Sequence, residues 1–139
     1  ILLYRKHVIT KQRYIQDLIV QMEMSGILPI PIFINGVEGH TIVRDLLTSE
    51  HEINGVRAGS IKRADSYQAS SSVKVDAIVN TIGFPLVGGP AGSMEAGRNV
   101  AVAEKLLSDM NLPYIVASPL LLQSISQWKK NGVLGLQSV

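Results

Sequence analysis

Apolar and polar positions follow two patterns along the chain, one typical of buried strands and the other of helices. Four runs rich in Ile, Leu and Val predict strands, at residues 1–4, 27–34, 76–82 and 113–117. These runs are continuous rather than alternating, as expected for a parallel sheet that is covered on both faces. Pro29 and Pro31 interrupt the second run. Because proline cannot donate a backbone hydrogen bond, we predict that this strand is short or lies at a sheet edge.

Apolar residues at helical spacing predict four helices between and after these strands. The predicted helices span residues 10–25, 42–47, 96–107 and 124–130. Residues 5–7 are predicted to form the loop that leaves the first strand. Residues 50–75, which hold two glycines and a run of three serines, are predicted to be an irregular surface excursion, with a short hairpin as one form.

The alternation of strands and helices predicts a single α/β domain over residues 1–139. The expected architecture is doubly wound and flavodoxin-like: a mostly parallel sheet of four or five strands with helices on both faces. Ligands of such folds bind beyond the carboxyl ends of the strands. The segments 5–10, 83–93 and 117–124 are expected to meet there.

Composition narrows the classes of function. The 139 residues are 46% hydrophobic and 17% charged, which excludes a disordered chain. The net charge of +2 comes from scattered Lys and Arg, so we expect neither nucleic acid nor a membrane surface as a partner. The absence of cysteine excludes disulfides, thiolate metal sites and thiol nucleophiles. No apolar run approaches the roughly 20 residues that span a bilayer, so no transmembrane segment is predicted.

Residues 83–93 form a glycine-rich segment between a predicted strand and a predicted helix, with four glycines and two prolines. Such glycines let the backbone approach a ligand closely and present N–H groups to an anion. The segment lacks the Gly-Lys-Ser/Thr of a P-loop and the G-x-G-x-x-G spacing of dinucleotide sites. A tight structural turn is therefore the alternative to a ligand-binding loop. The candidate substrate-binding residues of this region are Gly83, Phe84, Gly88, Gly89, Pro90, Gly92, Ser93, Glu95 and Arg98.

The chain has three histidines, and their spacing does not indicate a local metal site. His7 is predicted in the loop after the first strand, on the ligand side of the sheet, and is a further substrate-binding candidate; an exposed loop histidine is the alternative. His40 and His51 are predicted at the surface. A basic cluster near the first helix is either a solvated helix start or a means of attracting a carboxylate or phosphate; its members are Arg5, Lys6, Lys11 and Arg13. No catalytic triad or carboxylate pair can be argued from spacing, so no catalytic residue or metal ligand is predicted.

Residues 75–99 read VDAIVNTIGFPLVGGPAGSMEAGRN. This run closely resembles the large porphyrin-binding component of magnesium chelatase. The resemblance continues at residues 2–7, 113–117 and 135–139 and around Trp128, whereas residues 50–75 are the least distinctive part. The Gly-Gly-Pro core also resembles the related cobaltochelatase large subunit. The continuation at residues 91–97 is similar to the plant and cyanobacterial magnesium enzyme.

The resemblance implies a part in the ATP-dependent insertion of Mg²⁺ into protoporphyrin IX, the first committed step of chlorophyll biosynthesis in photosynthesis. Mg²⁺ and protoporphyrin IX would be substrates of the whole enzyme. Two AAA+ type subunits would supply ATP hydrolysis, and a porphyrin-carrying activator protein would be another partner. A plant member would lie in the chloroplast stroma or at its membranes, and a cyanobacterial member in the cytoplasm.

Such large subunits are many times longer than this sequence, whose two ends look cut: Ile1–Tyr4 reads as a strand already in progress, and no polar tail follows Gly135–Val139. We therefore expect an internal domain that is inactive alone, binds no cofactor itself and packs against the remaining domains of its subunit. The segment Gly83–Ser93 would shape a porphyrin-facing or interdomain surface, with Arg98 available for a propionate. One alternative is a scaffold domain without porphyrin contact, which large exposed apolar patches would favour. Another is a free-standing flavodoxin-like module that binds a small ligand, which a closed polar surface would favour.

Overall fold

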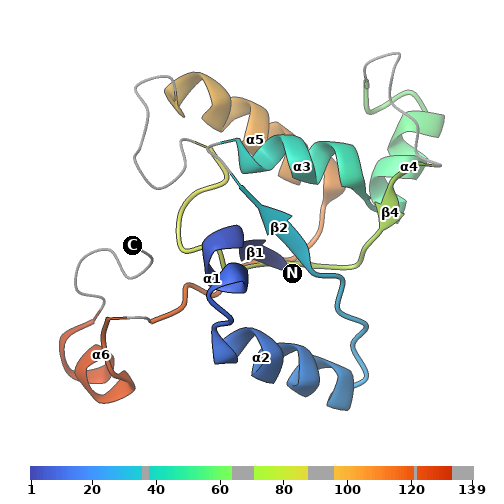
Figure 1. Cartoon of the computed structure of the whole chain (residues 1–139). Coiled ribbons are helices and arrows are strands. Elements are labelled where there is room, and N and C mark those ends of the chain that lie inside the picture. The colour runs from blue at the N-terminus through green and yellow to red at the C-terminus, as the bar shows by residue number, and fades with distance from the viewer. Residues whose placement is uncertain (36–37, 64–70, 88–95, 121, 133–139) are drawn as a thin grey trace. The chain divides into compact units, whose positions relative to one another are not determined.

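A computed structural model describes residues 1–35, 38–63, 71–87, 96–120 and 122–132, with the backbone alone at residues 96–98 (Figure 1). Its main sheet has four strands in the order β2-β1-β5-β6. The strands are β1 (Leu2–Tyr4), β2 (Ile32–Ile34), β5 (Ile78–Asn80) and β6 (Tyr114–Val116). β1 pairs in parallel with β2 and with β5. The predicted α/β class is confirmed, and the sheet has four strands rather than five.

Six helices and a second small sheet complete the described elements. The helices are α1 (Arg5–Ile9), α2 (Arg13–Met24), α3 (Gly39–Leu46), α4 (Glu50–Arg57), α5 (Ala96–Met110) and α6 (Ile125–Asn131). The small sheet joins β3 (Leu47–Thr48) in parallel to β4 (Val73–Lys74). Along the chain, the strands of the main sheet therefore stand in the order second, first, third, fourth, as in flavodoxin-like folds.

The chain divides into two compact units. Unit 1 comprises residues 1–35, 79–83 and 116–139, and unit 2 comprises residues 36–78 and 84–115. The core of unit 1 includes Leu2, Leu3, Ile34 and Ile82, and the core of unit 2 includes Val43, Leu47, Leu106 and Met110. The single domain expected for residues 1–139 stays a prediction.

Local sequence signals account for most element boundaries. β2 lies at the edge of the main sheet, as Pro29 and Pro31 predicted. Gly26 adopts a left-handed φ of 76° just after α2, a conformation that glycine tolerates best. Helix α6 begins at a capping box, in which the Ser124 side chain accepts from Gln127 N–H and the Gln127 side chain accepts from Ser124 N–H. These features were readable because each depends on neighbours in the sequence.

Two predictions of irregular structure are wrong. Residues 5–7 form the first turns of α1 rather than a loop. Residues 50–57 of the expected excursion form α4, and its first turn is capped by the Ser49 side chain, which accepts from Glu52 N–H. The Ser-x-x-Glu pattern at 49–52 is a local helix-start signal, which the prediction of irregular chain did not use. The expected short hairpin is also absent from the described part of residues 50–75, where β4 pairs in parallel with β3.

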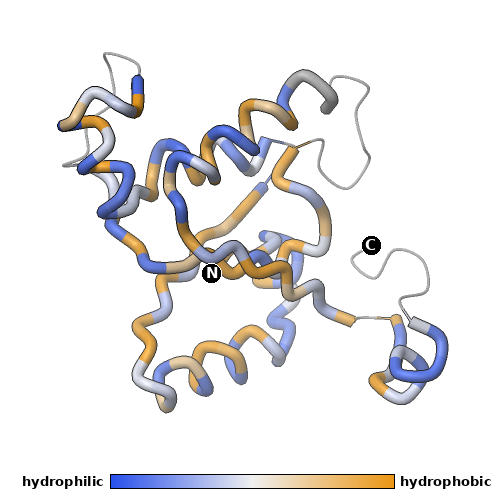
Figure 2. Tube along the Cα trace, turned by 180° about the vertical axis from the view of Figure 1, so that it is seen from behind, coloured by the Kyte–Doolittle hydropathy of each residue, from blue (hydrophilic) through white to orange (hydrophobic). Residues whose placement is uncertain are grey.

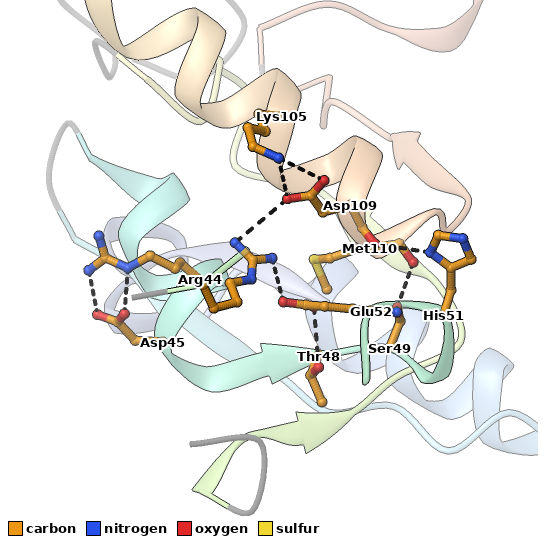
Figure 3. A network of polar contacts seen from close by, with 10 residues as sticks. Arg44, Asp45, Thr48, Ser49, His51, Glu52, Lys105, Asp109 and Met110 are labelled. Carbon is orange, nitrogen blue, oxygen red and sulfur yellow. Dashed lines mark hydrogen bonds and ion pairs between the residues drawn. The ribbon is translucent and has the colours of Figure 1, made fainter. Parts of the chain in front are cut away.

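Buried charges hold α4 to α5 within unit 2 (Figure 3). The Glu52 carboxylate is 1% exposed, accepts a 3.2 Å hydrogen bond from the Thr48 hydroxyl, and pairs with the guanidinium of Arg63. Asp109 of α5 lies 4.0 Å from Arg63 and 2.8 Å from Lys105. Because each carboxylate has a cationic partner, this cluster is a structural ion network rather than a candidate site.

The same junction is closed by backbone acceptors of α5. The Ser49 hydroxyl donates a 2.6 Å hydrogen bond to the Met110 carbonyl, and the His51 Nδ1 lies 3.1 Å from the Asp109 carbonyl oxygen. Gly55 completes the packing, since a Cβ there would lie 2.5 Å from Cδ1 of Ile61. The absence of a side chain therefore lets the segment that carries Arg63 return onto α4.

Candidate functional site

The carboxyl ends of β1 and β5 form the place in unit 1 where this type of fold binds ligands. The chain leaves β1 into α1, whose strand neighbour β2 lies on one side, while β5 pairs on the other side. In doubly wound sheets this change of direction opens a crevice beyond the strand ends. The segments that border it in unit 1 are residues 5–10 after β1 and Thr81–Gly83 after β5.

Hydrogen bonds fix the end of β5 against β1. The backbone N–H and the hydroxyl of Thr81 both donate to the Leu2 carbonyl, at 3.0 and 2.9 Å. The Asn80 side-chain oxygen accepts from the N–H of Ile82 at 2.9 Å. Gly83 then adopts a φ of 84°, which few other residues tolerate. The strand end is therefore a defined turn and not a loose connection.

His7 is buried at this edge. Its side chain belongs to α1, and the residue is only 2% exposed, so the predicted loop position is wrong. Nδ1 lies 2.9 Å from the Tyr14 hydroxyl, and the rings of Tyr4 and Tyr14 meet the imidazole edge to face, with centroids 5.4 and 6.0 Å away. Nε2 is buried and has no hydrogen-bond partner among the residues that the structure describes.

Burial keeps both groups of this pair neutral. It lowers the pKa of His7 from its usual 6.5, and the nearby charge of Lys6 acts in the same direction. Burial also raises the pKa of Tyr14 above 10, and a hydrogen bond with the Thr81 side chain opposes that shift. At neutral pH the pair is therefore an uncharged phenol beside an uncharged imidazole, and one imidazole nitrogen is left without a bond.

A hollow of about 230 Å³ lies at the end of β1 and β2, lined by Tyr4, Arg5, Lys6, Ile9, Thr10 and Asn35. Two of these residues are cationic, which suits a carboxylate or phosphate. Binding pockets for whole small molecules usually measure about 300–1,000 Å³. The hollow therefore fits one acidic group of a larger ligand better than it fits an entire ligand.

The structure describes only part of the predicted site. Gly83 ends the β5 turn, and Phe84 is half-buried. The backbone of Arg98 lies in α5. Gly88, Gly89, Pro90, Gly92, Ser93 and Glu95 lie outside the described residues. Of the basic cluster, Arg5 and Lys6 line the hollow, whereas Lys11 and Arg13 are not among its lining residues.

Sequence reasoning missed several polar residues and misplaced one histidine. Tyr4, Tyr14 and Thr81 were not candidates, although an aromatic residue three positions before His7 is a signal for a shared helical face. His40 was predicted at the surface but is 5% exposed in α3, whereas His51 is exposed, as predicted. Nearest neighbours in the sequence do not reveal which histidine a distant strand or helix covers.

Two further features concern only the described part of the chain. No group of three or more His, Cys, Asp or Glu side chains lies close enough to hold a metal ion there. None of the helices in that part has both the length and the apolar character to cross a membrane.

Comparison with known proteins places the whole chain in one family. Residues 1–139 match the family model CobN/Magnesium Chelatase. The chain is 36% identical over 137 residues to the magnesium-chelatase large subunit (BchH/ChlH type) of Chlorobaculum parvum, covering 99% of this chain and 9% of that protein. It is 30% identical over 140 residues to the chloroplastic magnesium-chelatase subunit ChlH of Oryza sativa subsp. indica, covering all of this chain and 8% of that protein.

A more distant relative is the corresponding magnesium-chelatase subunit of Rhodobacter capsulatus, 24% identical over 133 residues, with 95% of this chain and 9% of that protein covered. The chain thus spans less than a tenth of the length of each of these relatives. Both bacterial and chloroplastic proteins are among them. No solved structure matches the chain.

Proposed function

Because the chain belongs to the CobN/magnesium chelatase family, we propose that it is a segment of the large porphyrin-binding subunit of a magnesium chelatase. The whole enzyme would insert Mg²⁺ into protoporphyrin IX on the route to chlorophyll. This segment would contribute binding or positioning and would not insert metal alone. The single observation that carries the proposal is the match over all 139 residues, together with 36% identity to the magnesium-chelatase relative from Chlorobaculum parvum.

The proposed partners follow from the same relationship. The remaining domains of one long polypeptide come first, since the chain covers only 9% of its relative from Chlorobaculum parvum. Two AAA+ subunits that hydrolyse ATP and a porphyrin-carrying activator protein complete the proposed assembly. The proposed location is the chloroplast stroma in a plant and the cytoplasm in a bacterium.

Within the segment, we assign the substrate-facing surface to the carboxyl end of the sheet. Arg5 and Lys6 line a hollow of a size that suits one carboxylate, and protoporphyrin IX carries two propionates. The glycine-rich residues Gly83–Ser93, with Arg98, would extend this surface. His7 is 2% exposed, so we propose that it fixes α1, which carries Arg5 and Lys6, and does not touch the substrate.

A scaffold without porphyrin contact is the second candidate, and one observation favours it. Unit 1 exposes large apolar side chains around the connection from α2 to β2: Met24 by 76%, Ile27 by 54%, Leu28 by 85% and Phe33 by 54%. The connecting chain is mostly apolar in Figure 2. Such a surface is typical of a face that another part of a larger protein covers.

A porphyrin titration of the chain distinguishes the two roles. Protoporphyrin IX is added while the fluorescence of Trp128, the single tryptophan, and the porphyrin absorbance are followed. The proposal expects saturable binding that weakens about tenfold or more in the double variant Arg5→Ala/Lys6→Ala, since a charge-assisted bond is worth about 1.5–3 kcal/mol. The matched control is Lys11→Ala/Arg13→Ala, which removes equal charge outside the hollow.

Each outcome has a defined meaning. Equal weakening by the two double variants would show unspecific attraction and would overturn the assigned surface. No saturable binding by a chain with native circular dichroism would support the scaffold.

The enzymatic assignment needs a separate experiment. Here the chain replaces the matching segment of the Chlorobaculum parvum protein, and Mg²⁺ insertion by the assembled enzyme is measured. We expect retained activity, and loss of activity in a stable, assembled chimera would contradict the assignment.

A further inference from the structure

A second polar cluster lies in unit 2 and has no role in the surface proposed above. Glu38 immediately precedes α3, His40 is the second residue of that helix, and Asn99 lies in the first turns of α5. The His40 Nδ1 is 3.1 Å from Oε2 of Glu38. The Asn99 amide nitrogen is 3.1 Å from each carboxylate oxygen of Glu38. Figure 1 shows α3 and α5, the two helices that carry these residues, side by side.

The imidazole of His40 is buried and incompletely satisfied. Its side chain is 7% exposed, against 37% for Glu38. Although Nδ1 is close to the carboxylate, the two atoms do not meet in hydrogen-bond geometry, and Nδ1 has no hydrogen-bond partner in the described part of the chain. A buried polar atom of this kind normally has a partner. Nδ1 therefore faces a carboxylate oxygen with neither a hydrogen bond nor solvent between them.

The separation of the two atoms is that of neighbouring metal ligands. Zinc binds histidine nitrogen and carboxylate oxygen at about 2.0–2.2 Å. Two ligands at that distance, with an angle between about 90° and 110° at the metal, lie about 2.9–3.4 Å apart. The observed 3.1 Å falls within this interval. One ion could thus contact both atoms without a large movement of either side chain.

The backbone around both residues is held in place. The Glu38 carbonyl accepts from the Thr41 hydroxyl at 2.7 Å and from the Thr41 N–H at 3.1 Å. The His40 N–H donates to the Leu86 carbonyl at 3.1 Å, and Glu38 forms an isolated antiparallel bridge with Val87. Asn99 orients the carboxylate, as partners of metal-bound carboxylates commonly do. The donor pair is therefore formed before any ion binds.

We propose that Glu38 and His40 form an open divalent-metal site, with water in the remaining coordination positions and Asn99 as the residue that orients Glu38. The donor set selects the class of ion. An imidazole nitrogen with one carboxylate suits Zn²⁺, Co²⁺ or Ni²⁺, whereas Mg²⁺ prefers oxygen ligands and near-octahedral geometry. The site is thus distinct from any handling of Mg²⁺ as a substrate, and it does not depend on the proposed function.

Titration of the full chain with Zn²⁺ and with Co²⁺ tests this site. Calorimetry measures Zn²⁺ affinity, and the visible absorption of Co²⁺ reports a nitrogen ligand. We expect one tight site per chain, weakened about tenfold or more in Glu38→Gln and in His40→Gln, with Mg²⁺ binding at least about a hundredfold weaker. The matched control is His51→Gln, which removes an exposed histidine of the same unit and leaves the affinity unchanged.

Several results would overturn the proposal. They are an absence of stoichiometric binding, unchanged affinity in Glu38→Gln, loss of binding in His51→Gln, or equal affinity for Mg²⁺. Because His40 is buried and its variant risks misfolding, Glu38→Gln, which keeps the size of a half-exposed side chain, decides the question if His40→Gln does not fold. If ¹⁵N spectra show His40 protonated beside Glu38 and unaffected by Zn²⁺, the pair is an ion pair only.

Discussion

In unit 2 the buried carboxylate of Glu52 has a partner for each oxygen, whereas in unit 1 the buried imidazole of His7 has a partner for only one nitrogen. Both residues are nearly inaccessible, at 1% and 2% exposure. Glu52 joins three elements through Thr48, Arg63 and the α5 residues around Asp109 (Figure 3). His7 instead lies beside a cationic hollow at the carboxyl end of the sheet.

The difference separates stability from function. A fully paired buried network fixes one arrangement of its elements, and removal of one member leaves the others as uncompensated charge. A buried group with one unpaired nitrogen adds less to stability and is more often retained for a site. We therefore expect substitutions in the Glu52 network to affect mainly folding, and those around His7 to affect the α1 surface as well.

The largest effect is expected for Glu52→Ala. This change leaves the guanidinium of Arg63, whose side chain is 15% exposed, without its closest carboxylate. We expect a loss of about 3–5 kcal/mol in the free energy of unfolding. The matched control is Glu50→Ala, which breaks a pair with Lys74 in which the two side chains are 73% and 54% exposed. That control should cost less than about 1 kcal/mol.

Urea unfolding followed by circular dichroism measures both variants. If Glu52→Ala and Glu50→Ala cost the same small amount, the Glu52 network is solvated in solution, and the contrast with His7 disappears.

A smaller effect is expected for Tyr14→Phe. The change removes the one hydrogen-bond partner of the His7 Nδ1, at 2.9 Å, and leaves both nitrogens of a buried imidazole unpaired. We expect a loss of about 1–3 kcal/mol in the free energy of unfolding. A double-mutant cycle with His7→Phe isolates this contact. Tyr14→Phe should cost clearly less in the His7→Phe background, and equal costs in both backgrounds would mean that the hydrogen bond does not stabilise the fold.

The smallest effect concerns pH. Burial first, and the charge of Lys6 second, lower the pKa of His7 below 6.5 in the folded chain. As the pH falls below about 6.5, the unfolded chain binds a proton to this residue while the folded chain does not, so stability decreases toward the folded pKa. One such group contributes at most about 1.4 kcal/mol per pH unit.

Unfolding free energies measured between about pH 5 and pH 8 check this sign. His7→Gln should flatten the dependence relative to the unchanged chain, whereas the exposed control His51→Gln should not. A steeper dependence in His7→Gln would reverse the assignment of the neutral imidazole to the folded state.

Much of the fold was predictable where the determinants are local. The apolar spacing predicted α2, α5 and α6, and the prolines predicted that β2 lies at the sheet edge. The same local signals were misread at Ser49, where a helix start was taken as irregular chain. Of the candidate site, the basic residues Arg5 and Lys6 and the position after β1 were predictable, because parallel strands bring their carboxyl ends to one edge.

The burial of His7 and the pairing of Glu52 were not predictable, because their partners are distant in the chain. Thr81 donates to Leu2 across 79 positions, and Ser49 donates to Met110 across 61 positions. The sequence alone determined the α/β class, the run of strands and helices, and the family resemblance, since these depend on residue order. The tertiary structure decided which polar groups are removed from water and which find a partner there, because desolvation and pairing depend on contacts that no local pattern records.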